Sequence, residues 1–248
     1  MRILRRWWWL LPLVLILLMV SSIIWASTPA TPMPEALAAL QSDDEVQVEM
    51  EPWLIFRPLT DNPTVGLVLY PGGRIDPRAY APAAHALARE GYLVVIVRMP
   101  LNLAVFAPDR AADVLAAFPQ IDRWAVGGHS LGGAMAARFA YQHPKASQGL
   151  LLWAAYPAST DDLSGRTLAV TSIYGTHDGM ALGDKTAAAR LLPGNTHWVA
   201  IEGGNHAQFG WYGPQSGDGT ATISRQEQQR QIVGATLELL SGLADSGS

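Results

Sequence analysis

The stretch Gly128-His129-Ser130-Leu131-Gly132 decides the fold of this chain. It follows the apolar run Trp124 to Gly127, which reads as a buried strand, and it precedes the Ala-rich run Leu131 to His143, which has helical composition. A serine at such a junction sits on a turn so sharp that its hydroxyl stands clear of the backbone. Glycines two positions before and after it allow the two elements nearly to touch. The stretch therefore predicts a strand–turn–helix that presents Ser130 as a nucleophile.

Apolar runs and helical segments alternate along the rest of the chain. The expected strands are Glu45 to Met50, Trp53 to Arg57, Val65 to Tyr70, Leu93 to Val97, Trp124 to Gly127, Leu150 to Ala154, Thr167 to Tyr174 and His197 to Ile201. The expected helices are Tyr80 to Glu90, Asp109 to Ala117, Leu131 to His143, Lys185 to Leu192 and Ser224 to Leu240. The first two strands are typical of an antiparallel hairpin, and the later apolar runs are typical of strands buried on both faces. The pattern predicts an α/β fold with a mostly parallel sheet, helices on both faces and a site beyond the carboxyl ends of the strands.

Two residues on later loops are candidates to activate the serine. A serine nucleophile needs a histidine base, and the base needs a carboxylate that orients it. The expected base is His206, which follows the strand ending at Ile201 behind two glycines. The expected acid is Asp178, in the loop after the strand Thr167 to Tyr174, with Asp184 as the alternative. The remaining histidines are expected to be structural, and these are His85, His129, His143, His177 and His197.

Backbone N–H groups are expected to hold the negative charge that develops on a substrate carbonyl oxygen. One donor is the N–H of Leu131, the residue after the nucleophile. The second comes from the loop after the strand Val65 to Tyr70, where Gly72 leaves the backbone bare, and is the N–H of Gly73 or Arg74. Removing such a donor costs on the order of 3 kcal/mol in the transition state.

These residues together resemble those of the α/β-hydrolase-fold serine hydrolases, over roughly Val46 to Leu240. The resemblance rests on Tyr70-Pro71-Gly72-Gly73, Gly128-His129-Ser130-Leu131-Gly132, Gly175-Thr176-His177-Asp178 and Gly204-Asn205-His206. More narrowly, the chain is similar to the compact bacterial hydrolases of the dienelactone-hydrolase-like group. It departs from dienelactone hydrolases in its serine nucleophile, and from hormone-sensitive-lipase-like esterases in having Tyr-Pro-Gly-Gly where they carry His-Gly-Gly-Gly. The substrates of those relatives therefore do not transfer.

The resemblance implies a carboxylic-ester hydrolase that works through an acyl-enzyme on a small-molecule ester, without a cofactor. Many relatives insert a cap where this chain has only Ala155 to Arg166, so we expect minimal or no cap and a preference for short acyl groups. Tyr156, Trp211 and Tyr212 are candidate walls of the cleft. Two alternatives stay open, which are an acyltransferase of envelope metabolism and a non-catalytic binding protein on a hydrolase scaffold.

The amino terminus predicts a membrane segment. Three arginines precede the uncharged run Trp7 to Trp25, which approaches the roughly 20 residues that cross a bilayer. This order of charges places the amino terminus inside and the following chain outside. Residues 1–27 are therefore expected to be a transmembrane signal-anchor, residues 28–44 a tether and residues 45–248 an extracytoplasmic hydrolase domain. The alternative is a cleaved signal peptide and a secreted domain, for which Ala26-Ser27-Thr28 is a weak cleavage site.

Composition excludes several classes of function. The net charge of −4 offers no broad basic surface for nucleic acid. The chain has no cysteine, which excludes disulfides, thiol catalysis and Cys-based metal sites. Beyond the apolar segment about 200 residues remain, which suits a single α/β domain with a full-size core.

Overall fold

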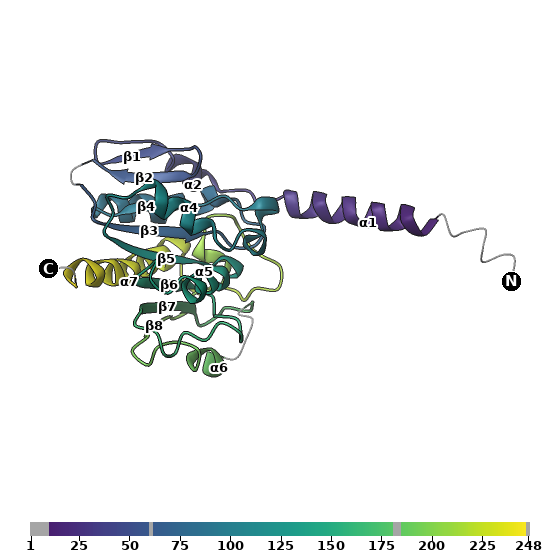
Figure 1. The fold of residues 1–248 in the computed structure, drawn as a ribbon. Helices are drawn as coiled ribbons and strands as arrows, with labels where there is room; N and C mark the ends of the chain where they lie inside the picture. The colour runs from purple at the N-terminus through teal and green to yellow at the C-terminus, as the bar shows by residue number, and fades with distance from the viewer. Residues whose placement is uncertain (1–9, 60–61, 181–184, 247–248) are drawn as a thin grey trace, which may run out of the picture.

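One eight-stranded sheet organises the chain, and the computed structural model describes residues 10–59, 62–180 and 185–246 (Figure 1). The strands are β1 (Val46–Glu49), β2 (Leu54–Pro58), β3 (Val65–Tyr70), β4 (Leu93–Ile96), β5 (Arg123–His129), β6 (Gly149–Trp153), β7 (Ala169–Gly175) and β8 (His197–Ile201). Their order across the sheet is β1-β2-β4-β3-β5-β6-β7-β8. The pairs β1–β2 and β2–β4 are antiparallel, and every later pair is parallel. The predicted hairpin and the predicted parallel sheet are both confirmed.

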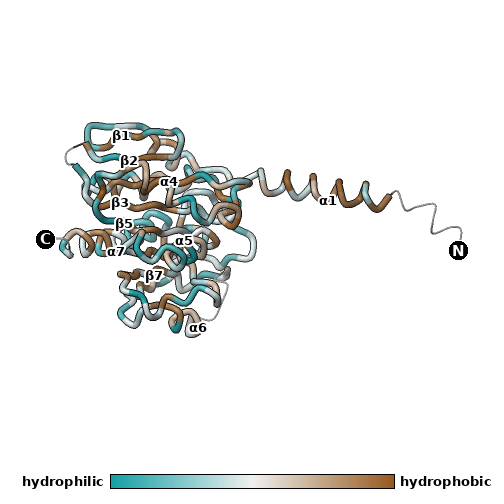
Figure 2. Tube along the Cα trace, viewed as in Figure 1, coloured by the Kyte–Doolittle hydropathy of each residue, from teal (hydrophilic) through white to brown (hydrophobic). Residues whose placement is uncertain are grey.

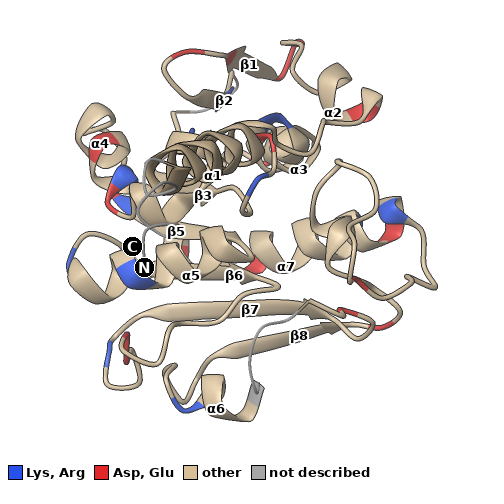
Figure 3. Ribbon diagram, turned by 90° about the vertical axis from the view of Figure 1, so that its right-hand side faces the viewer, with Lys and Arg blue, Asp and Glu red and all other residues tan. Residues whose placement is uncertain are grey.

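Helices cover both faces of the sheet. They are α2 (Pro34–Ala38), α3 (Ala81–Arg89), α4 (Arg110–Ala117), α5 (Leu131–Gln142), α6 (Lys185–Ala189) and α7 (Arg225–Asp245), with short 3₁₀ turns η2 (Pro77–Tyr80), η3 (Pro100–Asn102), η4 (Ala104–Phe106) and η5 (Ala207–Phe209). Helices α3 and α7 pack on one face, while α4 and α5 pack on the other (Figure 3). Leu67 and Leu69 of β3 enter the first core, and Val68 and Tyr70 enter the second. Because β3 is buried on both sides, its sequence is a continuous apolar run.

The predicted elements differ from the observed ones mainly at their ends. The clearest difference is α6, which was expected to reach Leu192 but ends at Ala189. Pro193 disfavours helical backbone at the residue before it, and the chain turns there instead. The predicted helix from Ser224 is, by contrast, longer than expected, because α7 continues past Leu240 to Asp245.

Helix α1 (Leu10–Ser27) projects away from the domain (Figure 1). It is mostly apolar (Figure 2), and apart from Ala26 and the half-buried Leu10 its side chains are exposed. By length and composition it is the one helix among the described residues that qualifies to cross a membrane. Of its serines, Ser22 donates its hydroxyl proton to the carbonyl of Leu18 at 2.8 Å, so that polar side chain is satisfied within the helix.

The segment after α1, expected to be a tether, packs against the domain. Ala30 donates to the carbonyl of Arg74 at 2.7 Å and pairs with Ile75 as a short parallel bridge. Met33 donates to the carbonyl of Trp211, and Ala36 of α2 is fully buried. The chain is extended here, as the prolines suggest, but its backbone bonds make it part of the folded unit.

Candidate active site

Ser130 occupies the turn between β5 and α5 in a conformation that is rare for a residue with a side chain. Its backbone angles are φ 52° and ψ −124°. Strand and helix approach so closely that a Cβ on Gly132 would lie 2.3 Å from the carbonyl oxygens of Tyr70 and Pro71. A Cβ on Gly128 would lie 2.6 Å from the backbone of Gly132. The two glycines therefore permit the sharp turn that the sequence predicts.

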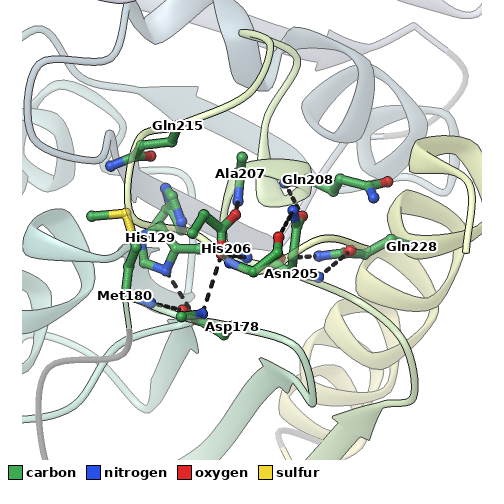
Figure 4. A network of polar contacts seen from close by, with 12 residues as sticks. His129, Asp178, Met180, Asn205, His206, Ala207, Gln208, Gln215 and Gln228 are labelled. Carbon is green, nitrogen blue, oxygen red and sulfur yellow. Dashed lines mark hydrogen bonds and ion pairs between the residues drawn. The ribbon is translucent and has the colours of Figure 1, made fainter. Parts of the chain in front are cut away.

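Asp178 and His206 meet beyond the carboxyl ends of β7 and β8 (Figure 4). The Nδ1–H of His206 donates to Oδ2 of Asp178 at 2.9 Å, and both side chains are almost fully buried. Asp178 also accepts from the backbone N–H of Met180 at 2.8 Å through its other oxygen. A carboxylate that accepts from Nδ1 fixes the imidazole tautomer and leaves Nε2 able to accept a proton.

The His206 ring lies beside the serine turn. Its centroid is 4.5 Å from that of His129, the residue immediately before Ser130. Its Nε2 is buried and has no hydrogen-bond partner within the described residues. The arrangement thus brings Asp178 and His206 together beside the turn of Ser130 and leaves Nε2 of His206 without a hydrogen bond to any described residue.

Asp218 holds the histidine loop in place, and the sequence did not single it out. Its carboxylate accepts from the backbone N–H groups of His206 at 3.1 Å and of Ala207 at 2.8 Å. It also accepts from Gly179, next to Asp178, at 3.2 Å. Asp218 therefore joins the acid loop to the base loop. The only local signal is a carboxylate between two glycines, and its partners are distant in sequence.

Gln228 of α7 supports the same loop from the opposite side. Its fully buried amide accepts from the N–H of Asn205 at 3.0 Å and donates to the carbonyl of Asn205 at 2.7 Å. The Asn205 side chain in turn donates to the carbonyl of Gly219 at 2.8 Å and accepts from Gln208 at 3.1 Å (Figure 4). The backbone on both sides of the base is thus bonded to fixed groups, which restricts where the imidazole can lie.

One N–H in the loop after β3 has no hydrogen-bond partner within the described part of the chain. Gly72 donates to the hydroxyl of Tyr80 at 2.9 Å, and Arg74 donates to the carbonyl of Asn102 at 2.8 Å. The N–H groups of Gly73 and Leu131 have no partner among the described residues. A Cβ on Gly73 would lie 3.2 Å from the Leu131 side chain, so the two residues are neighbours. Of the two candidates in this loop, Gly73 keeps a free donor and Arg74 does not.

Tyr80 and His129 form a buried pair that braces this loop. The Tyr80 hydroxyl accepts from the N–H of Gly72 at 2.9 Å and shares a hydrogen bond of 2.9 Å with Nδ1 of His129. Burial, and next the neighbouring His206, lowers the pKa of His129 well below its usual 6.5. Through Tyr80, His129 thus supports the loop that carries Gly73.

A small cavity opens at Ser130. It measures about 130 Å³ and is lined by Ser130, Leu131, Ala134, Ala154, Ala155, Tyr156 and Met180. Of the predicted aromatic walls, Tyr156 lines this cavity, whereas Tyr212 lines a neighbouring hollow beside Arg74 and Trp211 lines neither. The connection between β6 and β7 contains no helix, so no cap stands over the cavity from that side.

The remaining histidines have partners elsewhere. His177 lies 2.9 Å from the carbonyl of Thr220, His143 lies 2.8 Å from Asp109, and His85 and His197 lie near Asp43 and Glu238. Asp184, the alternative acid, lies outside the described residues. Within the described part of the chain no group of three histidine, cysteine or acidic residues is arranged to hold a metal ion.

Comparisons with known proteins agree with this geometry. The model of the alpha/beta hydrolase family matches residues 66–230. The chain belongs to this family. A predicted CIB-like hydrolase from Thermoplasma acidophilum is similar over 76% of this chain and 96% of its own, with TM-score 0.56 and 18% identity. ESTFA, in an Fe-lacking apo form, is similar over 80% of this chain and 84% of its own, with TM-score 0.50 and 14% identity. A search of curated proteins finds no match.

The family match confirms the α/β-hydrolase fold expected from the sequence and supports a hydrolytic activity for this alpha/beta hydrolase. At these identities the two structures show the fold alone. The resemblance to the dienelactone-hydrolase-like group stays a prediction.

Proposed function

We propose that this alpha/beta hydrolase is a serine esterase in which Ser130, His206 and Asp178 act as nucleophile, base and acid. The observation that carries the proposal is the buried Asp178–His206 pair, 2.9 Å apart, whose ring lies beside the strained Ser130 turn with a free Nε2. Residues that are strained or unsatisfied in a native structure concentrate at functional sites. Here both features occur at residues of the types that acyl transfer needs.

In the first half of the reaction, Ser130 Oγ attacks the acyl carbonyl carbon of the ester and its proton passes to Nε2 of His206. Asp178 accepts the Nδ1–H and stabilises the imidazolium that forms. The carbonyl oxygen becomes an oxyanion held by the N–H groups of Leu131 and Gly73, each contributing on the order of 3 kcal/mol. When the intermediate collapses, the C–O bond to the alcohol breaks, and the alcohol leaves with the proton from His206.

In the second half, water attacks the acyl-serine and gives a proton to Nε2 of His206. A second oxyanion forms on the same carbonyl oxygen and is held by the same donors. Its collapse releases the carboxylic acid, and the proton returns from His206 to Ser130. Every proton is passed between substrate, water and the two side chains, so the cycle closes without any further reactant.

The cavity supports a short acyl group as the preferred substrate. The cavity has a volume of about 130 Å³. The lining beside Ser130 consists of small and apolar side chains, among them Ala134, Ala154 and Ala155. Such a pocket favours an alkyl group of a few carbons, because each buried methylene contributes about 0.8 kcal/mol only while space remains for it.

The amino-terminal helix supports an anchored enzyme with an extracytoplasmic domain. Helix α1 is exposed and apolar, and arginines precede it in the sequence. Its last turn is bonded to the domain, since Asn102 donates to the carbonyl of Ala26 at 3.1 Å and Arg74 donates to that of Trp25 at 2.9 Å. Cleavage near Thr28 would remove Trp25 and Ala26 from these contacts, which favours an uncleaved anchor over a cleaved signal.

The test is fluorophosphonate labelling of the protein and of its Ser130→Ala variant. Labelling and ester turnover should both be lost in Ser130→Ala while the far-UV spectrum stays unchanged. Ser147→Ala is the matched control, because Ser147 precedes β6 at the opposite edge of the sheet and should label normally. Undiminished labelling of Ser130→Ala, with another serine modified, would overturn the assignment. Addition of an acceptor alcohol distinguishes a transferase, which would form a new ester in place of free acid.

A further inference from the structure

Helix α1 ends against the loops that build the candidate active site. The Arg74 guanidinium donates to the carbonyls of Trp25 and Thr28 at 2.9 and 3.0 Å, and it stacks on the Trp25 ring at 3.9 Å. Asn102 of η3 donates to the carbonyl of Ala26 at 3.1 Å. Arg74 follows Gly73 directly, so the end of α1 is fixed beside the loop that carries the proposed oxyanion donor. Figure 3 looks along α1 onto this edge of the sheet.

The segment next to this junction is apolar and exposed. Residues 99–108 carry no charge, although Arg98 and Asp109 flank them. Within this segment Leu101, Val105 and Phe106 are exposed, and Phe106 is 59% accessible. Large apolar side chains with this exposure are otherwise few on the described part of the domain, namely Leu37, Met50 and Leu59. Three exposed apolar side chains grouped beside an apolar helix indicate a site that contacts another protein or a membrane.

The turn that carries these exposed side chains has an unusual backbone conformation. Leu101 and Asn102 both have positive φ, at 52° and 54°, which residues with a side chain rarely adopt. The turn is held by the Arg74 N–H, which donates to the carbonyl of Asn102. Between the exposed residues, Leu103 turns inward, and its side chain lies 3.6 Å from where a Cβ on Gly73 would be. The segment therefore connects the end of α1, an exposed apolar surface and the site.

We propose that η3 and η4 insert Leu101, Val105 and Phe106 into the surface of the bilayer that α1 crosses. The surface that covers these side chains is the bilayer, because the apolar helix α1 leaves the domain at the same junction and brings the bilayer to them. Uncharged segments with exposed phenylalanine and leucine are suited to the boundary between headgroups and acyl chains. This second contact holds the carboxyl edge of the sheet, with the Ser130 cavity, against the membrane. The inference rests on the proposal that α1 spans the membrane.

The absence of cysteine allows a direct test in the full-length protein. Phe106→Cys and Val105→Cys each receive one nitrobenzoxadiazole fluorophore, and the labelled proteins are reconstituted into vesicles of phosphatidylcholine and phosphatidylglycerol. The vesicles contain lipids with a nitroxide either near the headgroup or deep in the acyl chain. Leu59→Cys is the matched control, because Leu59 is apolar and exposed but follows β2 at the amino edge of the sheet. Leu17→Cys, in the middle of α1, reports whether that helix is in the bilayer.

The shallow nitroxide should quench the fluorophores at positions 105 and 106, the deep nitroxide should quench that at position 17, and neither should quench that at position 59. Quenching at position 17 without quenching at 105 or 106 would overturn the surface contact and leave the anchor standing. No quenching at position 17 would overturn both the anchor and the contact. Equal quenching at positions 59 and 106 would also overturn the proposal, because the contact would not be specific to this edge. None of these outcomes depends on whether Ser130 is the nucleophile.

Discussion

Asp178 and Asp218 are the same residue type, but their carboxylates accept hydrogen bonds from different groups at the site. Asp178 accepts from the imidazole of His206, whereas Asp218 accepts from the backbone on either side of it. A carboxylate bonded to a ring acts on the tautomer and on the charge that forms there. A carboxylate bonded to backbone N–H groups acts on where the ring lies. In the proposed mechanism Asp178 is therefore catalytic and Asp218 is a positioning residue.

Asn substitutions at the two positions should separate these roles. Asp178→Asn should lower kcat by roughly 10³–10⁴-fold with little loss of stability, because the amide favours the wrong imidazole tautomer. Asp218→Asn should lower the free energy of unfolding by about 1–3 kcal/mol, because an NH₂ group faces backbone N–H donors, with a smaller loss of kcat. Steady-state kinetics and urea denaturation of both variants give the comparison. Asp178→Asn with near-wild-type kcat would show that the acid lies elsewhere.

His129 should make the stability of the fold depend on pH. Burial holds its pKa well below 6.5 in the folded state, so below that pH the unfolded chain binds a proton that the folded chain does not. Its contribution is complete above about pH 6.5 and is lost as the pH falls, by at most about 1.4 kcal/mol per pH unit.

Urea denaturation between pH 7 and pH 5 measures this slope, with His129→Gln as the comparison. Glutamine keeps a hydrogen-bonding partner for the Tyr80 hydroxyl but cannot take up a proton. The variant should be less stable at pH 7 and should lose stability less steeply on acidification. Parallel slopes for the two proteins would show that His129 is not the group responsible.

The sequence predicts single residues well where local geometry restricts the residue type. Ser130 is recognisable because a strand, a sharp turn and a helix require glycines at fixed offsets. Asp178 and His206 follow from their places after late strands, and the structure brings them together. Tyr80 and Asp218 were not predictable, because a tyrosine that bonds to Gly72 or a carboxylate that bonds to His206 is defined only by the folded loops.

At the scale of elements, the backbone at the junction of β5 and α5 lies so close to neighbouring backbone that only glycine fits. Gly132 opens the first turn of α5 under the carbonyls of Tyr70 and Pro71. Gly234 lies in the exposed middle of α7, where an added Cβ would meet no atom within 4 Å. The two glycines are both helical but differ in what surrounds them.

Alanine substitutions should therefore have opposite effects. Gly132→Ala should destabilise the protein and abolish ester turnover, because the new Cβ forces the β3 loop and Gly73 away from the serine turn. Gly234→Ala should stabilise it by roughly 0.5–1 kcal/mol, because alanine favours helix over the unfolded chain. Thermal denaturation and ester hydrolysis assays test both. If Gly132→Ala retained full activity, the tight turn would not be what positions the proposed oxyanion donors.

Strands buried on both faces were predictable from their apolar runs, but the packing of the segment after α1 was not. The prolines of residues 29–34 indicate an extended chain and do not indicate what it touches. The bonds from Ala30 to Arg74 and from Met33 to Trp211 are long-range. Arg74 accepts the first of them in a backbone conformation with positive φ, which no sequence pattern predicts. The expected tether is consequently a structural connection between the helix and the site.

For the whole molecule, α1, the loop after β3 and the Ser130 cavity form one continuous arrangement. The helix approaches the domain at the carboxyl edge of the sheet, where all the proposed catalytic loops lie (Figure 1). An enzyme held at a bilayer in this way is already at the interface and needs no lid that opens there. This bears on the proposed substrate, because in this arrangement the cavity beside Ser130, and no moving cap, would set access and acyl-chain length.

We therefore expect a preference for short acyl groups and no activation at an oil–water interface. The cavity of about 130 Å³ has no helical cap above it from the β6–β7 connection. Each methylene that fits gains about 0.8 kcal/mol, and those beyond the cavity wall gain little. In a series of p-nitrophenyl esters, kcat/KM should rise over the first few carbons and then fall. A steady rise to long-chain esters, or a jump in rate when the substrate forms micelles, would contradict a fixed, shallow site.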